Sequence, residues 1–280
     1  MSTGYSTVVE TARTYYNSDD ADHFYFHVWG GEDIHIGVYE TAHEAIADAS
    51  RRTVERMAAL VPRPGPDTRV LDMGAGYGGA ARWLAGRFGC RVTALNLSEK
   101  ENARNRDMNR ARGLDHLIEV LDGSFESVPC ADGAFDLVWS QDAILHSGRR
   151  GQVIAEAARV LRRGGDFVFT DPMQADDCPT GVLQPVLDRI HLDSLGSIGF
   201  YREQAAHHGL QVFDLVEMTD NLVTHYRRVR EELTHGRGAL AGKVSDAYID
   251  RMIAGLGHWV DAGEAGYLRW GILHLRKAAD

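Results

Sequence analysis

Short apolar runs alternate with amphipathic segments through most of the chain. The runs at 70–73, 91–96, 117–121, 135–140 and 167–172 have the length and content of buried strands. Helical spacing begins at 80–85, and a polar helix opens at 97–102 with Ser98 as candidate cap. A further helix is predicted over 149–162, with a basic last turn and a glycine stop within 163–166. Because strands that alternate with helices build parallel sheets, the pattern predicts a doubly wound, Rossmann-like α/β fold.

Several parts of the chain fall outside this alternation, and they set the expected domain organisation. The predicted parts are an amino-terminal arm at 1–66 with a helical pattern over 43–60, a ligand-binding core at 67–172, a first cap insertion at 173–199, continued core at 200–218 with a strand at 210–217, a helical second cap insertion at 219–265, and a last core strand within 266–280. The arm is rich in aromatic residues and histidines and ends in a proline-rich hinge. We expect it to fold over the core as a lid, and the insertions to determine substrate selectivity.

Charge and cysteine content narrow the expected partners. The net charge of −10, from 40 acidic and 30 basic residues, argues against nucleic acid and is compatible with a small cationic or zwitterionic substrate. Cys90, Cys130 and Cys178 fit neither a disulfide framework nor a zinc site, so we expect a reducing cytoplasm and no metal. No run approaches the roughly 18 apolar residues of a membrane helix, and no leader opens the chain. The expected partner is a small molecule, and a homodimer is compatible with the sequence.

A glycine-rich turn follows the first predicted strand, with Asp72 before glycines at 74, 76, 78 and 79. Glycine adopts left-handed backbone angles at little cost and lets a ligand lie against the main chain. The spacing also satisfies the dinucleotide motif G-x-G-x-x-G, so a nicotinamide nucleotide, or a turn without any ligand, is an alternative. That motif needs an acid about twenty residues later, where this chain has Asn96. An amide still hydrogen-bonds ribose hydroxyls, so the position disfavours only the nicotinamide alternative.

Polar and aromatic residues also follow the third and fourth predicted strands. Because ligands of open α/β sheets bind beyond the carboxyl ends of strands, residues 123–125 and 141–147 are expected to flank the ligand. A plain surface turn also explains the first segment. If the segment at 141–147 turns helical directly after its strand, Asp142 and His146 lie on the same helix face. His146 is then either a catalytic base or a residue that only lines the site.

The motif Asp-x-Gly-x-Gly-x-Gly at 72–78 resembles the first motif of class I methyltransferases, which use S-adenosylmethionine. A wider resemblance, nearly end to end, is to the sarcosine/dimethylglycine N-methyltransferases of glycine betaine synthesis, which are related to cyclopropane synthase-like and phosphoethanolamine methyltransferases. It is carried by residues 24–35, 72–81, 139–143, 145–147, 171–173, 225–226 and 257–261 with Gly263. This resemblance implies a class I methyltransferase sheet with an amino-terminal lid and helical caps.

The resemblance also implies a cofactor, S-adenosylmethionine with S-adenosylhomocysteine as product, and a set of site residues. The expected cofactor contacts are Trp29, Asp72, Gly74, Ala75, Gly76, Gly78, Asn96, Leu97, Asn102, Gly123, Ser124, Phe125 and Gln141. His146 and Asp142 are the expected catalytic residues. The expected substrate contacts are Tyr39, Arg189, Tyr201, Arg202, His225 and Tyr226. Aromatic rings would hold a methylated cation, and Arg189 or Arg202 a carboxylate.

The chemistry leaves alternatives open. An alkylamine with a pKa near the lysine value of about 10.4 is almost wholly protonated at neutral pH, so His146 either removes its proton or only positions the rare neutral form. A secondary-metabolite methyltransferase of the same lineage, for example one acting on an indole carbon, is the second hypothesis. A protein that binds S-adenosylmethionine without turnover is the third.

Overall fold

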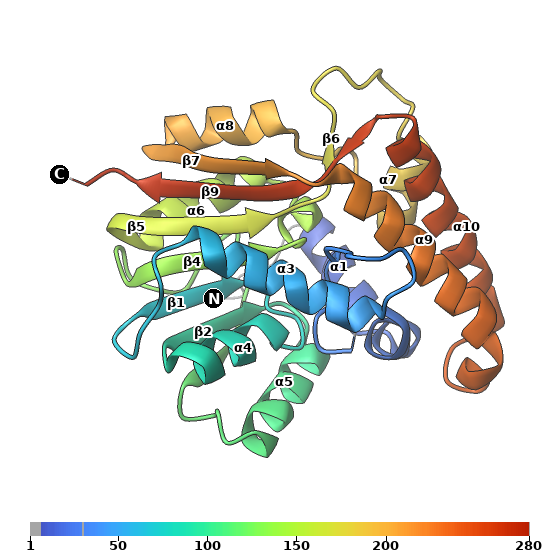
Figure 1. The fold of residues 1–280 in the computed structure, drawn as a ribbon, viewed down its shortest axis with the longest axis horizontal. Coiled ribbons are helices and arrows are strands. Elements are labelled where there is room, and N and C mark those ends of the chain that lie inside the picture. Colours follow the sequence, from blue (N-terminus) through green and yellow to red (C-terminus); the bar gives the residue numbers. More distant parts are fainter. Residues whose placement is uncertain (1–6, 30, 280) are drawn as a thin grey trace.

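The computed structural model describes residues 7–29 and 31–279, and at its centre lies a seven-stranded sheet of order β3-β2-β1-β4-β5-β9-β7 (Figure 1). The strands are β1 (Arg69–Met73), β2 (Arg91–Asn96), β3 (Ile118–Asp122), β4 (Phe135–Gln141), β5 (Leu161–Thr170), β7 (Leu210–Glu217) and β9 (Gly271–Lys277). Only β9 runs antiparallel to its neighbours β5 and β7. A separate pair is formed by β6 (Met173–Gln174) and β8 (Leu268–Arg269). The predicted class I methyltransferase fold is confirmed.

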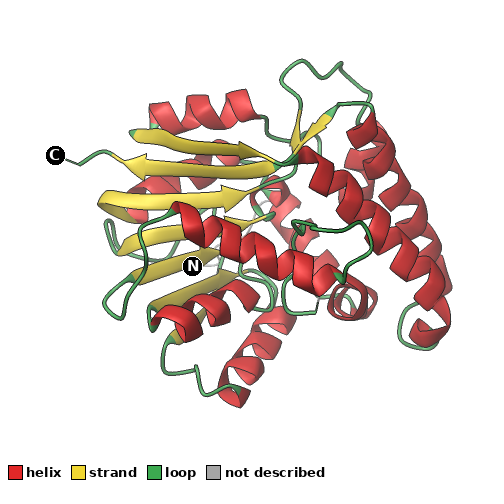
Figure 2. Cartoon of the chain, viewed as in Figure 1, coloured by secondary structure: helices red, strands yellow, loops and turns green. Residues whose placement is uncertain are grey.

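Helices cover both faces of the sheet (Figure 2). On one face, apolar residues of α3 (Ile46–Leu60) and α4 (Gly79–Phe88) pack on β1 and β2 in one core cluster. On the other, α6 (Arg150–Val160) and α8 (Ile198–His207) pack on β4 and β5. Ser98 directly precedes the polar helix α5 (Glu99–Ala111), and its side chain accepts a hydrogen bond from Glu101 N. The predicted N-cap is therefore confirmed.

A second apolar core lies beside the sheet, where α9 and α10 run together in Figure 1. It is built from α1 (Thr7–Tyr16), α2 (Asp19–Phe24), the π-helical turn η1 (Tyr25–Trp29), α7 (Gln184–Ile190), α9 (Thr219–His235), η3 (Gly236–Leu240) and α10 (Asp246–Glu264). Tyr226 and Trp259 stack at 4.6 Å within it, and Trp29 meets Tyr226 edge-on. The arm and the two insertions are therefore packed together. Residues 1–6 of the predicted arm, Gly30 and Asp280 lie outside the described residues.

The helix predicted over 149–162 is shorter, and its expected glycine stop is wrong. Helix α6 ends at Val160, and β5 begins at Leu161, six residues before the predicted start of that strand. Leu161 pairs with Phe135 and Asp166 pairs with Leu137, so the residues between them bulge out of the ladder. Gly164 has φ of 69°, which suits a bulge, and the buried Leu161 holds the start of the strand against the core.

The segment after β4 does not turn helical at once, contrary to one expectation. Asp142 has φ of 49°, and only a three-residue 3-10 turn, η2 (Ile144–His146), follows it. The carboxylate of Asp142 accepts hydrogen bonds from Ile36 N at 2.6 Å and from Trp270 Nε1 at 2.9 Å. These bonds hold Asp142 in place before the turn, so Asp142 and His146 do not share a helix face.

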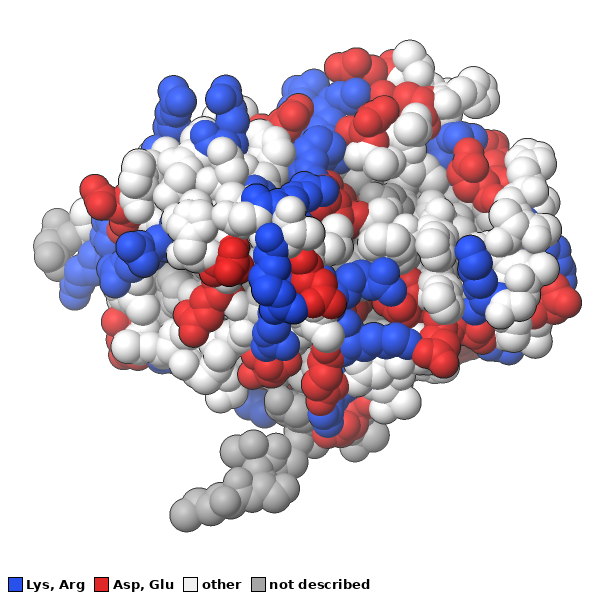
Figure 3. All heavy atoms as spheres, turned by 90° about the horizontal axis from the view of Figure 1, so that it is seen from below, with Lys and Arg blue, Asp and Glu red and all other residues white. Residues whose placement is uncertain are grey.

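Acidic and basic side chains lie interspersed on the face shown in Figure 3, without a continuous basic stripe there. Many form ion pairs with one another, as Arg237 does with Asp250 at 2.6 Å. Within the described ranges, no helix has the length and apolar content needed to cross a membrane.

Candidate active site

A cavity of about 730 Å³ lies beyond the carboxyl ends of β1, β2 and β4 and beneath α1. It is lined by Val9, Arg13, Tyr16, Ile34, Gly74, Gly76, Asn96, Leu97, Ser98, Glu101, Gly123, Ser124, Phe125, Gln141, Asp142, Ala143 and His146. Eight of the predicted cofactor contacts and both predicted catalytic residues come together here, under α1, which belongs to the arm that sequence analysis expected to be a lid.

The glycine turn forms the floor of this cavity. Gly74 and Gly76 have φ of 79° and 51°, angles that side chains disfavour. The backbone N–H groups of Gly74 and Ala75 donate to Leu95 O at 2.9 and 3.1 Å, which ties the turn to the end of β2. A Cβ on Gly74 would clash with the Cβ of Ala143. The turn therefore keeps its backbone close to the segment that carries His146.

A carboxylate that sequence analysis missed lies at the end of β2. Asn96 Nδ2 donates to Glu101 Oε2 at 2.9 Å, and Glu101 is only 4% exposed. Burial raises the pKa of Glu101 to about 7. The residue lies three positions after Ser98, which is the spacing of a helix capping box. The sequence therefore contains no sign that Glu101 lines the cavity. The predicted ribose position thus holds an amide and an acid together.

A smaller cavity of about 300 Å³ continues from the first and shares Ile34, Gly74 and Gln141 with it. Among the described residues, four buried side-chain atoms around it have no hydrogen-bond partner: Asp33 Oδ1, His35 Nε2, Asp72 Oδ2 and Gln141 Nε2. The first two lie 3.7 Å from each other, within ion-pair distance, whereas Asp72 Oδ2 and Gln141 Nε2 have no such neighbour. Burial raises the pKa of Asp72 to about 7. Since unpaired buried polar groups are costly, this arrangement is suited to a ligand that carries both an ammonium and a carboxylate.

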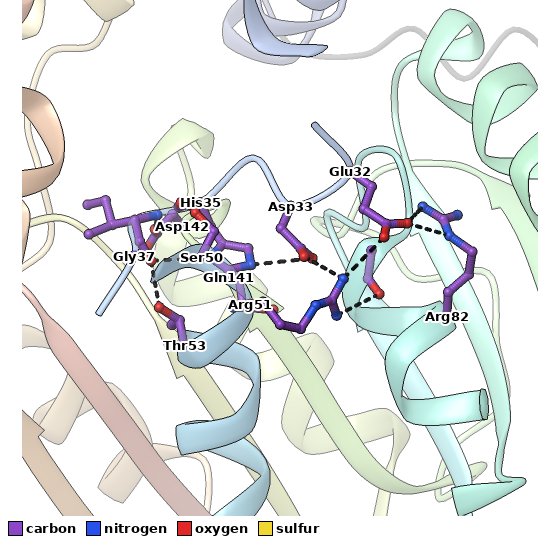
Figure 4. A network of polar contacts seen from close by, with 12 residues as sticks. Glu32, Asp33, His35, Gly37, Ser50, Arg51, Thr53, Arg82, Gln141 and Asp142 are labelled. Carbon is purple, nitrogen blue, oxygen red and sulfur yellow. Dashed lines mark hydrogen bonds and ion pairs between the residues drawn. The ribbon is translucent and has the colours of Figure 1, made fainter. Parts of the chain in front are cut away.

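The arm reaches this smaller cavity through a polar network (Figure 4). Glu32 accepts a hydrogen bond from Arg82 Nε at 2.9 Å, and Asp33 pairs with Arg51 Nη2 at 2.6 Å. Ser50 and Thr53 of α3 donate to the carbonyl groups of His35 and Ile36 at 3.0 and 2.8 Å. The arm residues at the site are therefore fixed by the core helices α3 and α4.

A hydrogen-bonded pair, Tyr16 and His146, separates the main cavity from a third one. The Tyr16 hydroxyl lies 2.8 Å from His146 Nε2. Burial, together with the charges of Arg150 and Arg189, lowers the pKa of His146 to about 4, so the ring is neutral at neutral pH. Burial also raises the pKa of Tyr16 well above 10, so its hydroxyl keeps its hydrogen and can donate it to Nε2 in the imidazole tautomer that carries its hydrogen on Nδ1.

The third cavity, of about 380 Å³, is lined by Thr11, Tyr15, Tyr16, Tyr25, His146, Arg189, Ile190, His191 and Leu192. Arg189 Nε is buried and has no hydrogen-bond partner among the described residues, whose ion pairs do not include Arg189. The polar groups that surround its guanidinium are hydroxyls, those of Tyr25, Tyr15, Tyr226 and Tyr248. A cation with only neutral neighbours is suited to an anionic ligand.

A wide surface groove between α1, α7 and α10 adjoins this third cavity and shares Thr11, Tyr15, Arg189 and His191 with it. Tyr16 and His146 in turn line both the third cavity and the main one. Arg189 therefore lies at the wall between the groove and the third cavity, and the Tyr16–His146 pair lies at the wall between the third cavity and the main one.

Other predicted cofactor contacts lie near the cavities without lining the main one. Asp72 and Ala75 line the smaller cavity. Gly78 directly precedes α4 and has φ of 78°. Asn102 lies on α5, and its Nδ2 donates to Asn96 O at the end of β2 at 3.1 Å. Trp29 packs in the second core against His225 and Tyr226 and lines none of the cavities described above.

The predicted substrate contacts separate into three groups. Arg189 lines the third cavity, and Tyr226 is a neighbour of its guanidinium. His225 Nδ1 accepts hydrogen bonds from Gly37 N at 3.1 Å and from the Tyr39 hydroxyl at 3.0 Å, so these two side chains hold the arm. On α8, Tyr201 is buried and Arg202 is exposed. Neither lines a cavity described here.

Tyr201 nevertheless supports the site from behind. Its hydroxyl donates to Asp171 Oδ2 at 2.6 Å, and Asp171 Oδ1 accepts from Leu145 N at 2.9 Å, next to His146. Sequence analysis did not assign Tyr15, Tyr16 and Tyr25 to the site. The cluster of aromatic residues in the arm was the available signal, but it did not distinguish cavity walls from core.

Comparison with known proteins agrees with the architecture. The family model described as "Methyltransferase domain" matches residues 71–169. The chain is 60% identical to the sarcosine/dimethylglycine N-methyltransferase of Halorhodospira halochloris, over 99% of this chain and 100% of that protein. It is 53% identical to the enzyme of the same name from Aphanothece halophytica, over 96% of this chain and 98% of that protein.

A crystal structure of a Galdieria sulphuraria protein classed as a sarcosine dimethylglycine methyltransferase superposes with a TM-score of 0.89 at 42% identity. The match covers 95% of this chain and 100% of that one. The similarity in sequence and fold thus extends over nearly the whole chain. The enzyme is a methyltransferase that uses S-adenosylmethionine as methyl donor. The chain belongs to the sarcosine/dimethylglycine N-methyltransferase family.

Proposed function

We propose that this enzyme methylates the amino nitrogen of sarcosine and of dimethylglycine, in the direction of glycine betaine. The names of its full-length relatives support this assignment. The observation that carries it is Arg189, which forms no ion pair among the described residues and whose buried Nε has no hydrogen-bond partner, in the small cavity next to the Tyr16–His146 pair. Both acceptors have a carboxylate one carbon away from the nitrogen, so a cation on one side and a base on the other match their two ends.

Arg189 binds the acceptor carboxylate in this proposal. A guanidinium donates two parallel hydrogen bonds to a carboxylate, and such charge-assisted bonds are stronger than neutral ones. The tyrosine hydroxyls around Arg189 are neutral, so the acceptor supplies the missing negative charge. Aromatic faces of Tyr15, Tyr16 and Tyr25 line the same space and attract the methylated ammonium group.

The cofactor is assigned to the main cavity and its smaller extension. Asn96 and Glu101 would bind the ribose hydroxyls, and Phe125 would flank the base. The unpaired atoms of Asp72, His35 and Gln141 match the ammonium and carboxylate of the amino-acid end. When bound, S-adenosylmethionine supplies an electrophilic methyl group on a sulfonium sulfur.

The Tyr16–His146 pair removes the proton of the acceptor. An ammonium next to the Tyr16 oxygen passes its proton to that oxygen while the hydroxyl hydrogen of Tyr16 moves to His146 Nε2. This leaves a free lone pair on the amine and a cationic imidazole. Since Arg189 is one cause of the low pKa of His146, a carboxylate bound to Arg189 offsets that charge and makes His146 a stronger base when the acceptor is present.

Asp142 has a positioning role in this scheme. Both of its carboxylate oxygens accept hydrogen bonds, one from the arm at Ile36 and one from Trp270. It therefore joins the end of β4, the arm and the segment before β9, next to the cavity.

The second candidate, methylation of a larger natural product at carbon, is supported less well by the cavity. The cavity next to His146 is lined by three tyrosines and an arginine, whereas a broad acceptor would need an apolar wall.

A turnover assay separates these candidates. The enzyme is incubated with labelled S-adenosylmethionine and sarcosine, dimethylglycine, phosphoethanolamine or an indole, and release of S-adenosylhomocysteine is followed. We expect turnover with the first two only. Turnover of the indole without either amino acid would contradict the assignment.

The cellular compartment and the oligomeric state are also part of this proposal. Cys90, Cys130 and Cys178 are all free thiols, which suits a reducing cytoplasm. A homodimer remains a prediction, which sedimentation velocity tests directly.

A further inference from the structure

One face of α10 carries Tyr248, Met252 and Gly255 at intervals of four and three residues, and this face lies against Arg189. Met252 Sδ lies 3.9 Å from Arg189 Nη2, and the Tyr248 hydroxyl is one of the polar neighbours of the guanidinium. Residues at this spacing project from the same side of a helix. Gly255 is thus the position where the stem of Arg189 crosses α10.

The contact at Gly255 leaves no space for a side chain. A Cβ built on this glycine would lie 2.9 Å from Arg189 Cγ and 3.0 Å from Nε, and closer still to Cδ. Real Cβ atoms essentially never come so near, and these atoms belong to the middle of the side chain, so the whole stem would have to move. The glycine lies inside α10 and is not among the described residues with positive φ, so backbone conformation does not require it.

We propose that Gly255 is a positioning residue for acceptor recognition: it lets Arg189 lie against α10, which places the guanidinium at the wall of the cavity that holds the acceptor. This rests on the proposed role of Arg189 as the carboxylate-binding residue. A glycine in a helix interior lowers helix stability, and close packing of the arginine is the compensating gain. The residue therefore contributes to selection of acceptors that have a carboxylate.

The test compares Gly255→Ala with Gly257→Ala on the same helix. Both changes bring the same gain in helix propensity. At Gly257, however, an added Cβ would meet only Arg230 atoms at 3.5 Å or more, an ordinary contact. The readout is the ratio of kcat/KM for dimethylglycine to that for dimethylethanolamine, which has the same amine but a hydroxyl in place of the carboxylate. Calorimetry with S-adenosylhomocysteine reports the cofactor site separately.

We expect Gly255→Ala to lower this ratio about 10-fold or more, mainly through KM for dimethylglycine, because a charge-assisted hydrogen bond is weakened. Gly257→Ala should leave the ratio unchanged, and both variants should bind S-adenosylhomocysteine normally. An equal loss on both acceptors would indicate general disruption and would overturn the proposal.

Arg189→Met distinguishes failure of this inference from failure of the proposed function. If Arg189→Met lowers the ratio and Gly255→Ala does not, the role of Gly255 is wrong and the role of Arg189 stands. If Arg189→Met leaves the ratio unchanged, the carboxylate assignment itself is wrong.

The double variant Gly255→Ala/Arg189→Ala covers the case in which Gly255→Ala folds poorly. Alanine at position 189 has neither of the clashing atoms Cγ and Cδ, so the ratio of the double variant should equal that of Arg189→Ala alone and its melting temperature should be no lower. Additive losses would show that Gly255 acts independently of Arg189 and would overturn the proposal.

Discussion

The chemistry at residue scale depends on the neutral state of His146. Burial lowers its pKa to about 4, far below that of an alkylammonium near about 10.4, so the free enzyme is a weak base. In the proposed mechanism the acceptor itself changes this balance, because its carboxylate would face Arg189, whose charge helps to keep the pKa of His146 low. Base strength and acceptor recognition are therefore linked through two side chains of one cavity.

Replacement of His146 by Gln should lower kcat by about 100-fold or more at pH 7, the usual effect of losing a general base. The deficit should shrink as the pH rises toward the pKa of the amine, because more of the acceptor is then already neutral. The measurement is kcat from pH 7 to 10 with saturating dimethylglycine. Tyr16→Phe should show the same trend, because it breaks the same 2.8 Å hydrogen bond. A deficit that is constant across this range would contradict a role in proton removal.

Replacement of Arg189 by Met should raise the pKa of His146 in the free enzyme, because it removes one of the charges that keep it low. An NMR titration of the imidazole signals, with His146→Gln to assign the resonance, measures the change. Arg202→Met is the matched control, since that arginine is exposed on α8 and lines no cavity of the site. A pKa that stays the same in Arg189→Met would show that the guanidinium does not act on His146.

At the scale of elements, the site depends on how the arm is attached to the core. Residues 31–39 run between the sheet and α9, and their backbone is bonded by side chains from several elements: Asp142 after β4, Ser50 and Thr53 on α3, and His225 on α9. Burial lowers the pKa of His225 to about 3, so it stays neutral and accepts the Gly37 N–H at any physiological pH.

Asp142→Asn should loosen this attachment while the shape of the side chain is kept. An amide has one acceptor oxygen, so either the Ile36 N–H or the Trp270 N–H loses its partner, at a cost of roughly 1–3 kcal/mol for a buried group. We expect faster hydrogen exchange at residues 34–38 and weaker binding of S-adenosylhomocysteine, seen by mass spectrometry and calorimetry. Unchanged exchange at these residues would show that other contacts alone hold the arm.

Most elements could be predicted from apolar periodicity, because a buried strand leaves a local signal. The predicted strands at 91–96 and 210–217 coincide with β2 and β7. The prediction failed at Gly164, where a bulge and a helix stop have the same local signature, and at Asp142, whose backbone is fixed by bonds to Ile36 and Trp270, far away in sequence. Local patterns carry no information on such distant partners.

At the scale of the whole molecule, two cores meet at the site. The sheet core carries the glycine turn and His146, while the second core brings Tyr25, Arg189 and Tyr248 together from the arm, the first insertion and the second. This convergence explains why sequence analysis proposed Arg189 and Tyr226 but not Tyr15, Tyr25 or Tyr248: these neighbours depend on the packing of three segments that lie far apart in the chain. The glycine turn, in contrast, is contiguous and could be predicted.

The stability of the whole fold should depend on His274, a buried histidine on β9 of the seven-stranded sheet. His274 on β9 is 1% exposed and lies between two carboxylates, with Nε2 at 2.7 Å from Asp166 on β5 and Nδ1 at 2.8 Å from Asp214 on β7. Burial lowers the pKa of His274, but the hydrogen bonds to Asp166 and Asp214 outweigh burial and raise it above 6.5. The charged imidazole thus joins three adjacent strands.

The sign of the pH effect follows from these shifts. Because the pKa of His274 is higher in the folded state, its contribution is complete below about 6.5 and is lost as the pH rises through the folded value. Burial raises the pKa of Asp166, but bonds from His274 and Arg276 outweigh burial and lower it, so that contribution is lost only as the pH falls below about 4. His274→Gln should therefore lower the free energy of unfolding most at pH 5, by roughly 1–3 kcal/mol, and less at pH 8. Urea unfolding at pH 5 and at pH 8 measures this free energy, and His116→Gln at an exposed histidine is the control. An equal loss at both pH values would mean that His274 contributes by packing rather than by charge.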